Sequence, residues 1–260
     1  MRVLVLNPPY HRRFSRSQRS PAVIKSGVIY YPIWLAYATG VLEQDGFTVR
    51  LLDAPATGLD LQAVLGLADE WQPRLVVMET STPSFHNDLE VAQAIKTRAK
   101  QVYLLVVGPH VTALPKESLE LGPAVDAVAR GEYDYTVREL ARMLSDSDDL
   151  KPEAILGLSY RDEDGAVRHN PDRPPIEDLD ALPFVSQVYK RHLRIQDYFY
   201  SIARYPEVTI VSGRGCPHRC TYCLWPQTIT GHRYRRRSVA DVAEEFEFVA
   251  RELPQVKEIF

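Results

Sequence analysis

Apolar strand-like runs alternate with helix-like segments five times over residues 1–145, and this alternation constrains the fold more than any other feature. Runs such as Val3–Leu6 and Val102–Val107 are continuously apolar, so both faces of each strand should be buried. The expected strands are Val3–Leu6, Thr48–Leu52, Arg74–Met78, Val102–Val107 and Ala124–Ala129. The repeat predicts an α/β, Rossmann-like domain in which five parallel strands form an open sheet with helices on both faces.

The helices between these strands are predicted from their apolar periodicity and their boundary residues. The first, Pro32–Asp45, begins with a proline and ends before Gly46, as helices often do. The others are Leu61–Trp71, Ser84–Lys100, Pro115–Leu121 and Tyr133–Leu144. Residues 10–31 form a long loop that carries His11, Arg12, Arg13, Arg16 and Arg19. A loop of this length is either a solvated basic segment or a lid over an anionic or amide-rich ligand.

The residues that follow the predicted strands are small, hydroxyl-bearing or proline. In open parallel sheets, ligands bind outside the carboxyl ends of the strands. We therefore predict a cofactor site made of Asn7, Pro8, Thr80, Ser81, Thr82, Ser84, Gly108, Pro109, His110, Val111, Gly131, Glu132 and Tyr133. No G-x-G-x-x-G follows the first strand and no G-x4-G-K-[ST] occurs, so dinucleotide and P-loop functions lose support.

The second half of the chain is divided by composition. The acidic stretch Ser145–Pro152, with Asp146, Asp148 and Asp149, marks a domain boundary. A hairpin is predicted from Ile155–Tyr160 and Ala166–His169 around an Asp-Gly turn. Proline-rich residues 170–184 indicate a linker, and Val188–Phe199 a connecting helix. The predicted domains are residues 1–145, a linker over 146–204, and a third unit over 205–260.

All three cysteines lie on one short loop, with three and then two residues between them. Cys216, Cys220 and Cys223 could hold three irons of a [4Fe–4S] cube and leave the fourth iron open. A zinc site with His218 as fourth ligand is the alternative, although zinc cysteines usually come as C-x2-C pairs and no second pair follows. The odd count and the absence of a secretory signal argue against disulfides.

The C-x3-C-x2-C spacing, with Tyr222 before the last cysteine, resembles the radical S-adenosylmethionine (SAM) superfamily. In that family an open iron binds SAM, and an electron from the cluster yields a 5′-deoxyadenosyl radical. The resemblance implies that the three cysteines are cluster ligands and that Tyr222 packs beside the adenine, or else walls off the cluster. Arg237, in the basic run 232–237, would clamp the SAM carboxylate, unless this run is a solvated loop.

The same resemblance implies the start of a TIM-type barrel. Its first β/α unit would be the strand Val208–Val211 and the helix Val239–Leu253, followed by a second strand, Val256–Phe260. One unit and a strand cannot close a barrel, so the chain is expected to be a piece of a longer enzyme.

Together, the sheet-edge residues and the cysteine loop resemble cobalamin-dependent radical SAM enzymes. The D-x-H-x-x-G pattern of other cobalamin proteins is missing, so His110 is not expected to ligate cobalt. The resemblance implies radical C–H functionalisation, either methyl transfer or ring formation and rearrangement, of a small-molecule or lipid substrate. No catalytic residue beyond the cofactor ligands is predicted. The phrase Cys223–Gln227 is similar to the hopanoid-biosynthesis branch. The alternative is a non-catalytic Rossmann-like sensor with a zinc loop.

Charge and hydropathy limit the partners. The net charge of −3 gives no general attraction to nucleic acid. No run approaches the ~18 apolar residues of a membrane span, and the start lacks a signal peptide. We therefore expect a cytoplasmic protein, which suits an oxygen-sensitive cluster, with a ferredoxin or flavodoxin as electron donor. Peripheral contact with a membrane is left open.

Overall fold

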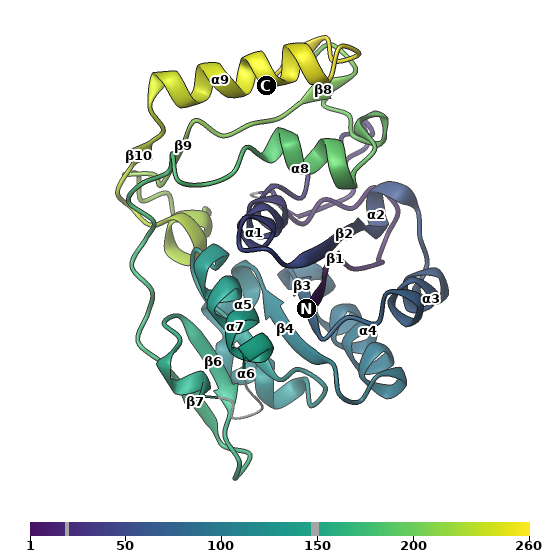
Figure 1. Cartoon of the computed structure of the whole chain (residues 1–260), viewed down its shortest axis with the longest axis vertical. Coiled ribbons are helices and arrows are strands. Elements are labelled where there is room, and N and C mark those ends of the chain that lie inside the picture. The colour runs from purple at the N-terminus through teal and green to yellow at the C-terminus, as the bar shows by residue number, and fades with distance from the viewer. Residues whose placement is uncertain (19–20, 147–150) are drawn as a thin grey trace.

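A seven-stranded, mostly parallel sheet forms the centre of the protein (Figure 1). The computed structural model describes residues 1–18, 21–146 and 151–260. The strands are β1 (Arg2–Asn7), β2 (Thr48–Asp53), β3 (Leu75–Glu79), β4 (Tyr103–Val107), β5 (Ala127–Ala129), β6 (Leu158–Arg161) and β7 (Val167–His169). Their order is β2-β1-β3-β4-β5-β6-β7, and β1 to β5 are parallel. The α/β class and the five parallel strands are confirmed.

The hairpin β6–β7 corrects the prediction of a five-stranded sheet. β6 pairs antiparallel with β5, with Ala129 opposite Leu158, and β7 pairs with β6. Leu158 and Ser159 are completely buried, because this strand completes the edge of the sheet that β5 would otherwise expose. The turn was predicted from Asp-Gly, and Gly165 has a φ of +79°, but the pairing partner of the hairpin is not visible in the local pattern. Asp148 and Asp149 lie outside the described residues.

Alternate side chains of the strands enter two different cores. Val3 and Val5 belong to one core, and Leu4 and Leu6 to the other. The first core lies under α1 (Ile33–Gln44) and α7 (Asp134–Asp146). The second lies under α3 (Leu61–Trp71) and α4 (Phe85–Arg98). Continuous apolar strands were predicted to be buried on both faces, and they are. The short helices are α2 (Ala54–Thr57), α5 (Pro109–Ala113) and α6 (Pro115–Leu121), of which α2 and α5 were not predicted.

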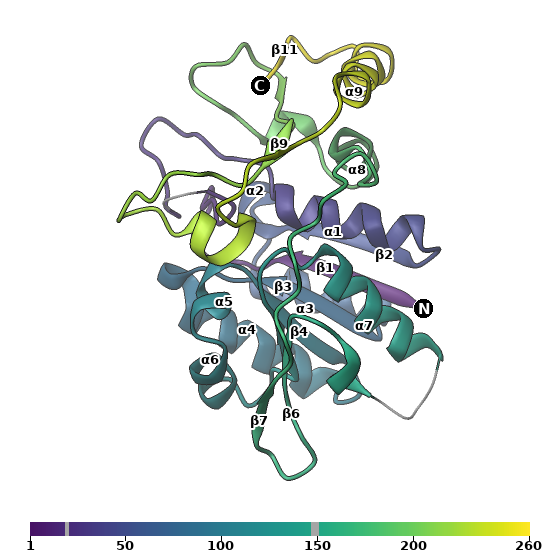
Figure 2. The same cartoon turned by 90° about the vertical axis from the view of Figure 1, so that its left-hand side faces the viewer.

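The C-terminal part lies on the α1 side of the sheet. α8 (Val185–His192) packs between α1 and α9 (Val239–Glu252), and the β6–β7 hairpin lies at the opposite end of the molecule (Figure 2). α8 ends before the predicted limit of the connecting helix, and a short 3₁₀ turn, Ile195–Asp197, follows it. β8 (Glu207–Val208) and β11 (Glu258–Ile259) are parallel and are linked through α9. This is one parallel β-α-β unit, and a barrel stays a prediction.

Two further strands enclose the cysteine loop. β9 (Gly213–Arg214) and β10 (Arg235–Arg236) pair antiparallel, and a π-helical turn, Pro226–Thr230, lies between them. The hairpin β9–β10 is therefore the local support of the three cysteines.

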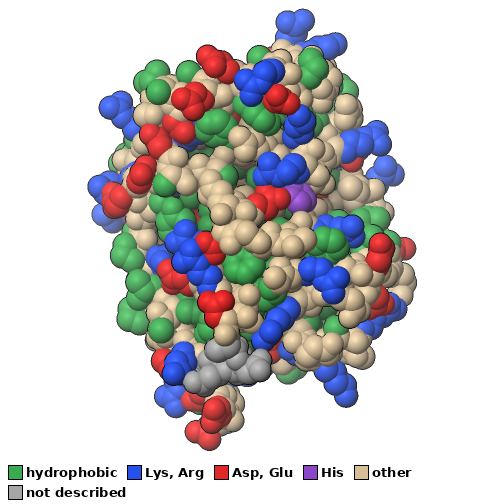
Figure 3. All heavy atoms as spheres, viewed as in Figure 1, with side chains coloured by type: hydrophobic (Ala, Val, Ile, Leu, Met, Phe, Trp, Pro, Cys, Tyr) green, Lys and Arg blue, Asp and Glu red, His purple; other side chains and the backbone are tan. Residues whose placement is uncertain are grey.

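Charged side chains of both signs are interspersed over the face shown in Figure 3. This distribution matches the small net charge of −3. Among the described residues, no helix has the length and apolar character needed to cross a membrane.

Candidate functional site

The cysteine loop, residues 215–234, joins β9 to β10 and is shaped by backbone contacts. The Cys216 amide donates to the Gly231 carbonyl (3.1 Å), and the Cys223 amide donates to the Cys220 carbonyl (3.1 Å). Gly215 has a φ of +91°, and a Cβ there would collide with the Arg233 carbonyl oxygen. All three thiols are free, Cys220 being exposed and the other two partly exposed. The loop is thus folded without using its sulfurs.

The thiols do not form a site for a single ion. Within the described ranges, no three His, Cys, Asp or Glu side chains are gathered to hold one metal ion, so the zinc alternative with His218 gains no support. The donor set nevertheless fits an iron–sulfur cluster. It consists of three free thiols, and thiolates are the ligands that such clusters prefer.

A cavity of about 500 Å³ lies between the cysteine loop and the N-terminal domain. Cys216, Cys223 and Trp225 line one side, and Ser17, Tyr30 and Trp34 belong to the other. The two indole rings meet edge to face at 5.2 Å. Their ring nitrogens, and the hydroxyl of Tyr133, are buried without a hydrogen-bond partner among the residues that the structure describes. Orphaned buried donors are rare in proteins. Both indoles belong to the lining of this cavity, whereas the buried Tyr133, predicted to contact a cofactor, does not.

Two buried ion pairs link the β9–β10 hairpin to the loop after β5. Arg214 Nη1 lies 2.8 Å from Asp134 Oδ2, and Arg235 binds both oxygens of Glu132 at 2.8 and 2.5 Å. Burial alone would lower the pKa of Arg214, but the Asp134 and Glu132 charges outweigh it and the pKa is raised. Glu132 was predicted to contact a cofactor. Both of its oxygens bind Arg235, and Oε2 also accepts from the Ile176 amide at 2.8 Å, so its carboxylate is already engaged within the protein and the cofactor contact stays a prediction.

The predicted polar residues at the ends of β1 and β3 belong to a buried network around Arg16 and Asp88, and their contact with a cofactor stays a prediction. This guanidinium is 1% exposed; its Nη2 lies 2.7 Å from Asp88 Oδ1, and its Nη1 donates to Asn7 and to the Pro8 carbonyl at 2.8 Å each. Asp88 in turn accepts from Thr80 (2.7 Å) and Ser84 (2.6 Å). Ser81 is also buried and shares a 2.8 Å hydrogen bond with Ser84. These residues lie at the strand ends as predicted, but their polar groups are satisfied within the protein.

The burial of Arg16 argues against one of the two interpretations of residues 10–31, the solvated basic loop. The segment is not simply solvated, since Arg16, Phe14 and Ile29 are all buried. Arg12 and Arg13 are exposed, and Arg19 lies outside the described residues. A lid function stays a prediction.

The predicted residues after β4 and β5 are mixed in their placement. Gly108 has a φ of +117°, and a Cβ there would collide with the Thr80 carbonyl oxygen, so close strand packing already requires this glycine. His110 Nδ1 lies 3.1 Å from Thr82 Oγ1, and its ring lies 4.1 Å from that of Phe85. Burial lowers the pKa of His110. Pro109 is half-buried, and Val111 is buried in the core.

After β5, Gly131 has a φ of +68°, and an added Cβ there would meet nothing within 4 Å. Thr82, Pro109, His110 and Gly131 therefore remain accessible at the sheet edge.

The two residues assigned to SAM differ in exposure. Tyr222 is 72% exposed. Arg237 is buried, with Nε 2.5 Å from Asp241 and Nη1 2.5 Å from Glu245, so it already holds two carboxylates at the start of α9. Both SAM contacts stay predictions, and a SAM carboxylate at Arg237 would have to compete with these partners.

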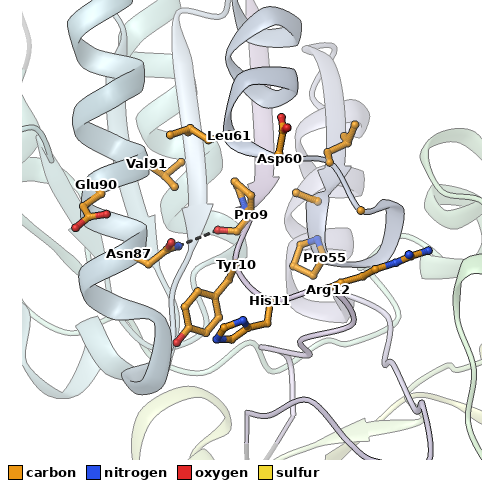
Figure 4. A pocket seen from close by; sticks show the side chains of 13 residues that line it. Pro9, Tyr10, His11, Arg12, Pro55, Asp60, Leu61, Asn87, Glu90 and Val91 are labelled. Atoms are coloured by element: carbon orange, nitrogen blue, oxygen red, sulfur yellow. Dashed lines mark hydrogen bonds between the residues drawn. The ribbon is translucent and has the colours of Figure 1, made fainter.

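A second cavity, of about 440 Å³, shares no lining residue with the first. Figure 4 shows it between the loop after β1, the start of α3 and the helix α4, where the Asn87 amide donates to the Pro9 carbonyl at 2.8 Å. Asp60 and Glu90 line it together with His11 and Arg12. This mixture of opposite charges selects no particular ligand.

Glu79, at the end of β3, gives the fold a pH dependence. It is buried, and Ser17 Oγ donates to both its oxygens at 2.9 and 3.0 Å. Burial raises the pKa of Glu79 from 4.5 to about 7, against the lowering effects of Ser17 and Arg16. Between these values the folded protein keeps a proton that the unfolded chain has released, so the free energy of unfolding falls as pH rises from 4.5 to 7. Burial also raises the pKa of Asp53, to about 6, with the same sign.

We expect Glu79→Gln to reduce this pH dependence and to be more stable than the natural chain at pH 8 by about 3 kcal/mol, because each pKa unit corresponds to about 1.4 kcal/mol. Urea unfolding at pH 5, 6, 7 and 8 measures the effect. Glu70→Gln, at an exposed position of α3, is the matched control. An identical pH slope in Glu79→Gln and the natural chain would contradict the prediction.

The fold agrees with comparisons to known protein families. Residues 19–141 match the family model described as B12 binding domain. The chain is 31% identical over 245 residues to an uncharacterized methyltransferase of Pyrococcus horikoshii, covering 94% of this chain and 50% of the relative. It is 28% identical to the anaerobic magnesium-protoporphyrin IX monomethyl ester cyclase of Rubrivivax gelatinosus (97% and 43%). It is also 28% identical to the cobalamin-dependent radical SAM methyltransferase TokK of Streptomyces tokunonensis (90% and 34%).

A solved structure shares the fold. The cobalamin-dependent SAM radical enzyme OxsB, with aqua-cobalamin and SAM bound, superposes with a TM-score of 0.71 at 18% identity, over 95% of this chain and 31% of that one. The chain spans half or less of the length of these relatives. Residues 19–141 are thus similar to B12-binding domains. This region is related to cobalamin-dependent radical SAM enzymes and to anaerobic magnesium-protoporphyrin cyclases.

Several features of the site were missed in the sequence. Arg214 and Asp134 were not singled out, and Arg235 was noted as part of the basic run 232–237 without its partner Glu132. Trp34 and Trp225, which line the cavity, were not singled out as site residues. The only available signal was position, since Arg214 and Trp225 each stand two residues from a cysteine.

Proposed function

We propose that this chain holds the cobalamin and the [4Fe–4S] cluster of a radical SAM enzyme. One observation carries the proposal: Cys216 and Cys223 line a cavity whose other side belongs to the region that matches the B12-binding family. Cys216, Cys220 and Cys223 would hold the cluster, and the accessible residues Thr82, Pro109, His110 and Gly131 would face cobalamin. When bound, the cluster supplies an electron for cleavage of SAM and cobalamin serves as carrier of a methyl group or as redox partner.

The protein's part in this chemistry is to orient the groups and to exclude water. Trp34, Trp225 and Tyr30 give the cavity aromatic walls, and a dry site limits side reactions of reactive species. The same walls favour a substrate with a large apolar part. Together with the phrase Cys223–Gln227, this supports a lipid such as a hopanoid within the proposal. A one-electron donor of the ferredoxin or flavodoxin type completes it.

The test is anaerobic reconstitution of the chain with iron, sulfide and cobalamin. We expect about four irons per chain and a broad absorption at about 400 nm, as thiolate-ligated clusters show, together with bound cobalamin. One zinc and no iron would instead favour a sensor module. With SAM carrying a labelled methyl group, label in the product indicates methyl transfer, and an unlabelled product that has lost hydrogen indicates ring formation.

We expect cobalamin to bind without a histidine on cobalt. His110 is turned to Thr82 and Phe85, and no Asp stands two residues before it. The electron paramagnetic resonance spectrum of the Co(II) form should show no nitrogen splitting from His110 and should be the same in the natural chain and in His110→Ala. His86→Ala, at an exposed position of α4, is the control. Nitrogen splitting that disappears only in His110→Ala would contradict the prediction.

A further inference from the structure

Both ends of the cysteine loop are tied to one short segment of the N-terminal domain. Arg214 lies two residues before Cys216, and Arg235 is the first residue of β10. Their partners, Asp134 and Glu132, stand two residues apart at the start of α7 and just before it. The loop therefore leaves and returns to the same place at the carboxyl edge of the sheet.

The four charged groups are closed off from water. Arg214 and Asp134 are 3% exposed, and Arg235 and Glu132 are 5% exposed. The guanidinium carbon of Arg214 also lies over the rings of Tyr37 (4.4 Å) and Trp34 (5.1 Å). Two cations and two anions make the group neutral. Replacement of a buried ion pair by apolar residues often leaves the stability unchanged or raises it. In some proteins the function of buried polar or ionic groups is instead to select one arrangement of the packed segments.

The geometry of the second pair fixes an orientation as well as a contact. Arg235 binds Glu132 through two nitrogens, an arrangement with strict directional demands. Its Nη2 also donates to the Thr230 carbonyl at 2.7 Å. Thr230 ends the π-helical turn after the cysteines and lines the cavity. One carboxylate of the N-terminal domain thus holds, through Arg235, the far side of the cysteine loop.

We propose that Glu132 and Asp134 are positioning residues that fix the cysteine loop over the carboxyl edge of the sheet. This inference rests on the proposed function, because it is the distance between the cluster and cobalamin that the two carboxylates would set. They touch neither group themselves, and they act through Arg235 and Arg214.

The first test needs no cofactor. In Glu132→Gln and Asp134→Asn, which keep shape and remove charge, we expect hydrogen exchange of residues 213–237 and alkylation of the partly buried Cys216 and Cys223 to become about tenfold faster or more, as loss of a charged hydrogen bond implies for a local opening. Exchange in β1 to β4 should be unchanged. Glu139→Gln, which removes a carboxylate of α7 that pairs with Arg173 instead, should change neither quantity. The milder Arg235→Lys keeps the charge, loses the two-nitrogen contact and should show an intermediate effect.

Two results would overturn the inference. One is unchanged exchange of residues 213–237 in Glu132→Gln and Asp134→Asn. The other is equal acceleration in β1 to β4, which would mean general destabilisation.

A second test uses the loaded chain, where the magnetic coupling between Co(II) and the reduced cluster should weaken in both variants and not in Glu139→Gln. If the natural chain holds no cluster or cobalamin, the proposed function fails. The exchange test still shows whether Glu132 and Asp134 hold the cysteine loop in place. If the chain holds both and the coupling is unchanged in the variants, the positioning inference fails alone.

Discussion

Replacement of Cys216, Cys220 or Cys223 by alanine is expected to abolish assembly of a stable [4Fe–4S] cluster and, with it, any cleavage of SAM. The chain contains only these three cysteines, so no other thiolate can take the place of the missing ligand. The hydrogen bonds that shape the loop come from the backbone amides of Cys216 and Cys223. The three variants should therefore fold like the natural chain.

Iron content, absorption at about 400 nm and 5′-deoxyadenosine formation measure the loss, and the thermal unfolding of the apo variants controls for folding. His218→Ala separates the cluster from a zinc site, because it should leave the iron content unchanged. A full cluster in any one alanine variant would defeat the assignment of ligands. Loss of bound metal in His218→Ala would favour zinc.

Arg16→Met is expected to lower the free energy of unfolding by about 3–5 kcal/mol, the usual effect of removing one partner of a buried ion pair. The substitution leaves Asp88 buried at 1% exposure without its cation. It also removes the donor that reaches Asn7 and the Pro8 carbonyl. The effect should be smaller at low pH, because burial already raises the pKa of Asp88 and a protonated Asp88 needs no counter-charge.

Urea unfolding at pH 5 and pH 8 tests this expectation. Arg13→Met is the matched control on the same loop, since Arg13 is exposed and its Nη1 donates to the Gly27 carbonyl at the long distance of 3.4 Å. The double variant Arg16→Met with Asp88→Asn should recover part of the loss, because the unpaired charge is then absent. Equal stability of Arg16→Met and Arg13→Met would contradict the prediction.

The elements that were predicted correctly are those whose sequence signals lie within the element itself. Leu61–Trp71 and Pro115–Leu121 have their predicted bounds, because apolar periodicity and boundary residues are contained within each segment. The pairing of β6 with β5 was missed because it depends on an exposed edge that no nearby residue reveals. For the same reason, the residues at which a strand begins and ends were easier to predict than the strands with which it pairs.

The candidate site shows the same division. Three cysteines in one loop need no distant partner to be recognised, and the structure keeps all three thiols free. The polar groups at the strand ends were assigned to a ligand. Thr80 and Ser84 have their partner Asp88 only eight and four positions away, but the arginines that complete the two networks pair with residues far away in the chain. Arg16 meets Asp88 across 72 positions, and Arg235 meets Glu132 across 103. A polar residue at a sheet edge is equally suited to either role, and only the folded chain shows which one it has.

The hairpin added beyond β5 has a consequence for self-association. A long, flat outer strand invites another copy of the chain to pair with it. Here the outermost strand β7 has only three residues, of which Arg168 and His169 are exposed. At the other border, the Leu51 amide of β2 is occupied by His192 Nδ1 of α8 at 3.3 Å. A short charged strand on one side, and on the other a helix whose His192 occupies an outer amide of β2, both oppose intermolecular strand pairing, so concentrated solutions should resist aggregation through this sheet.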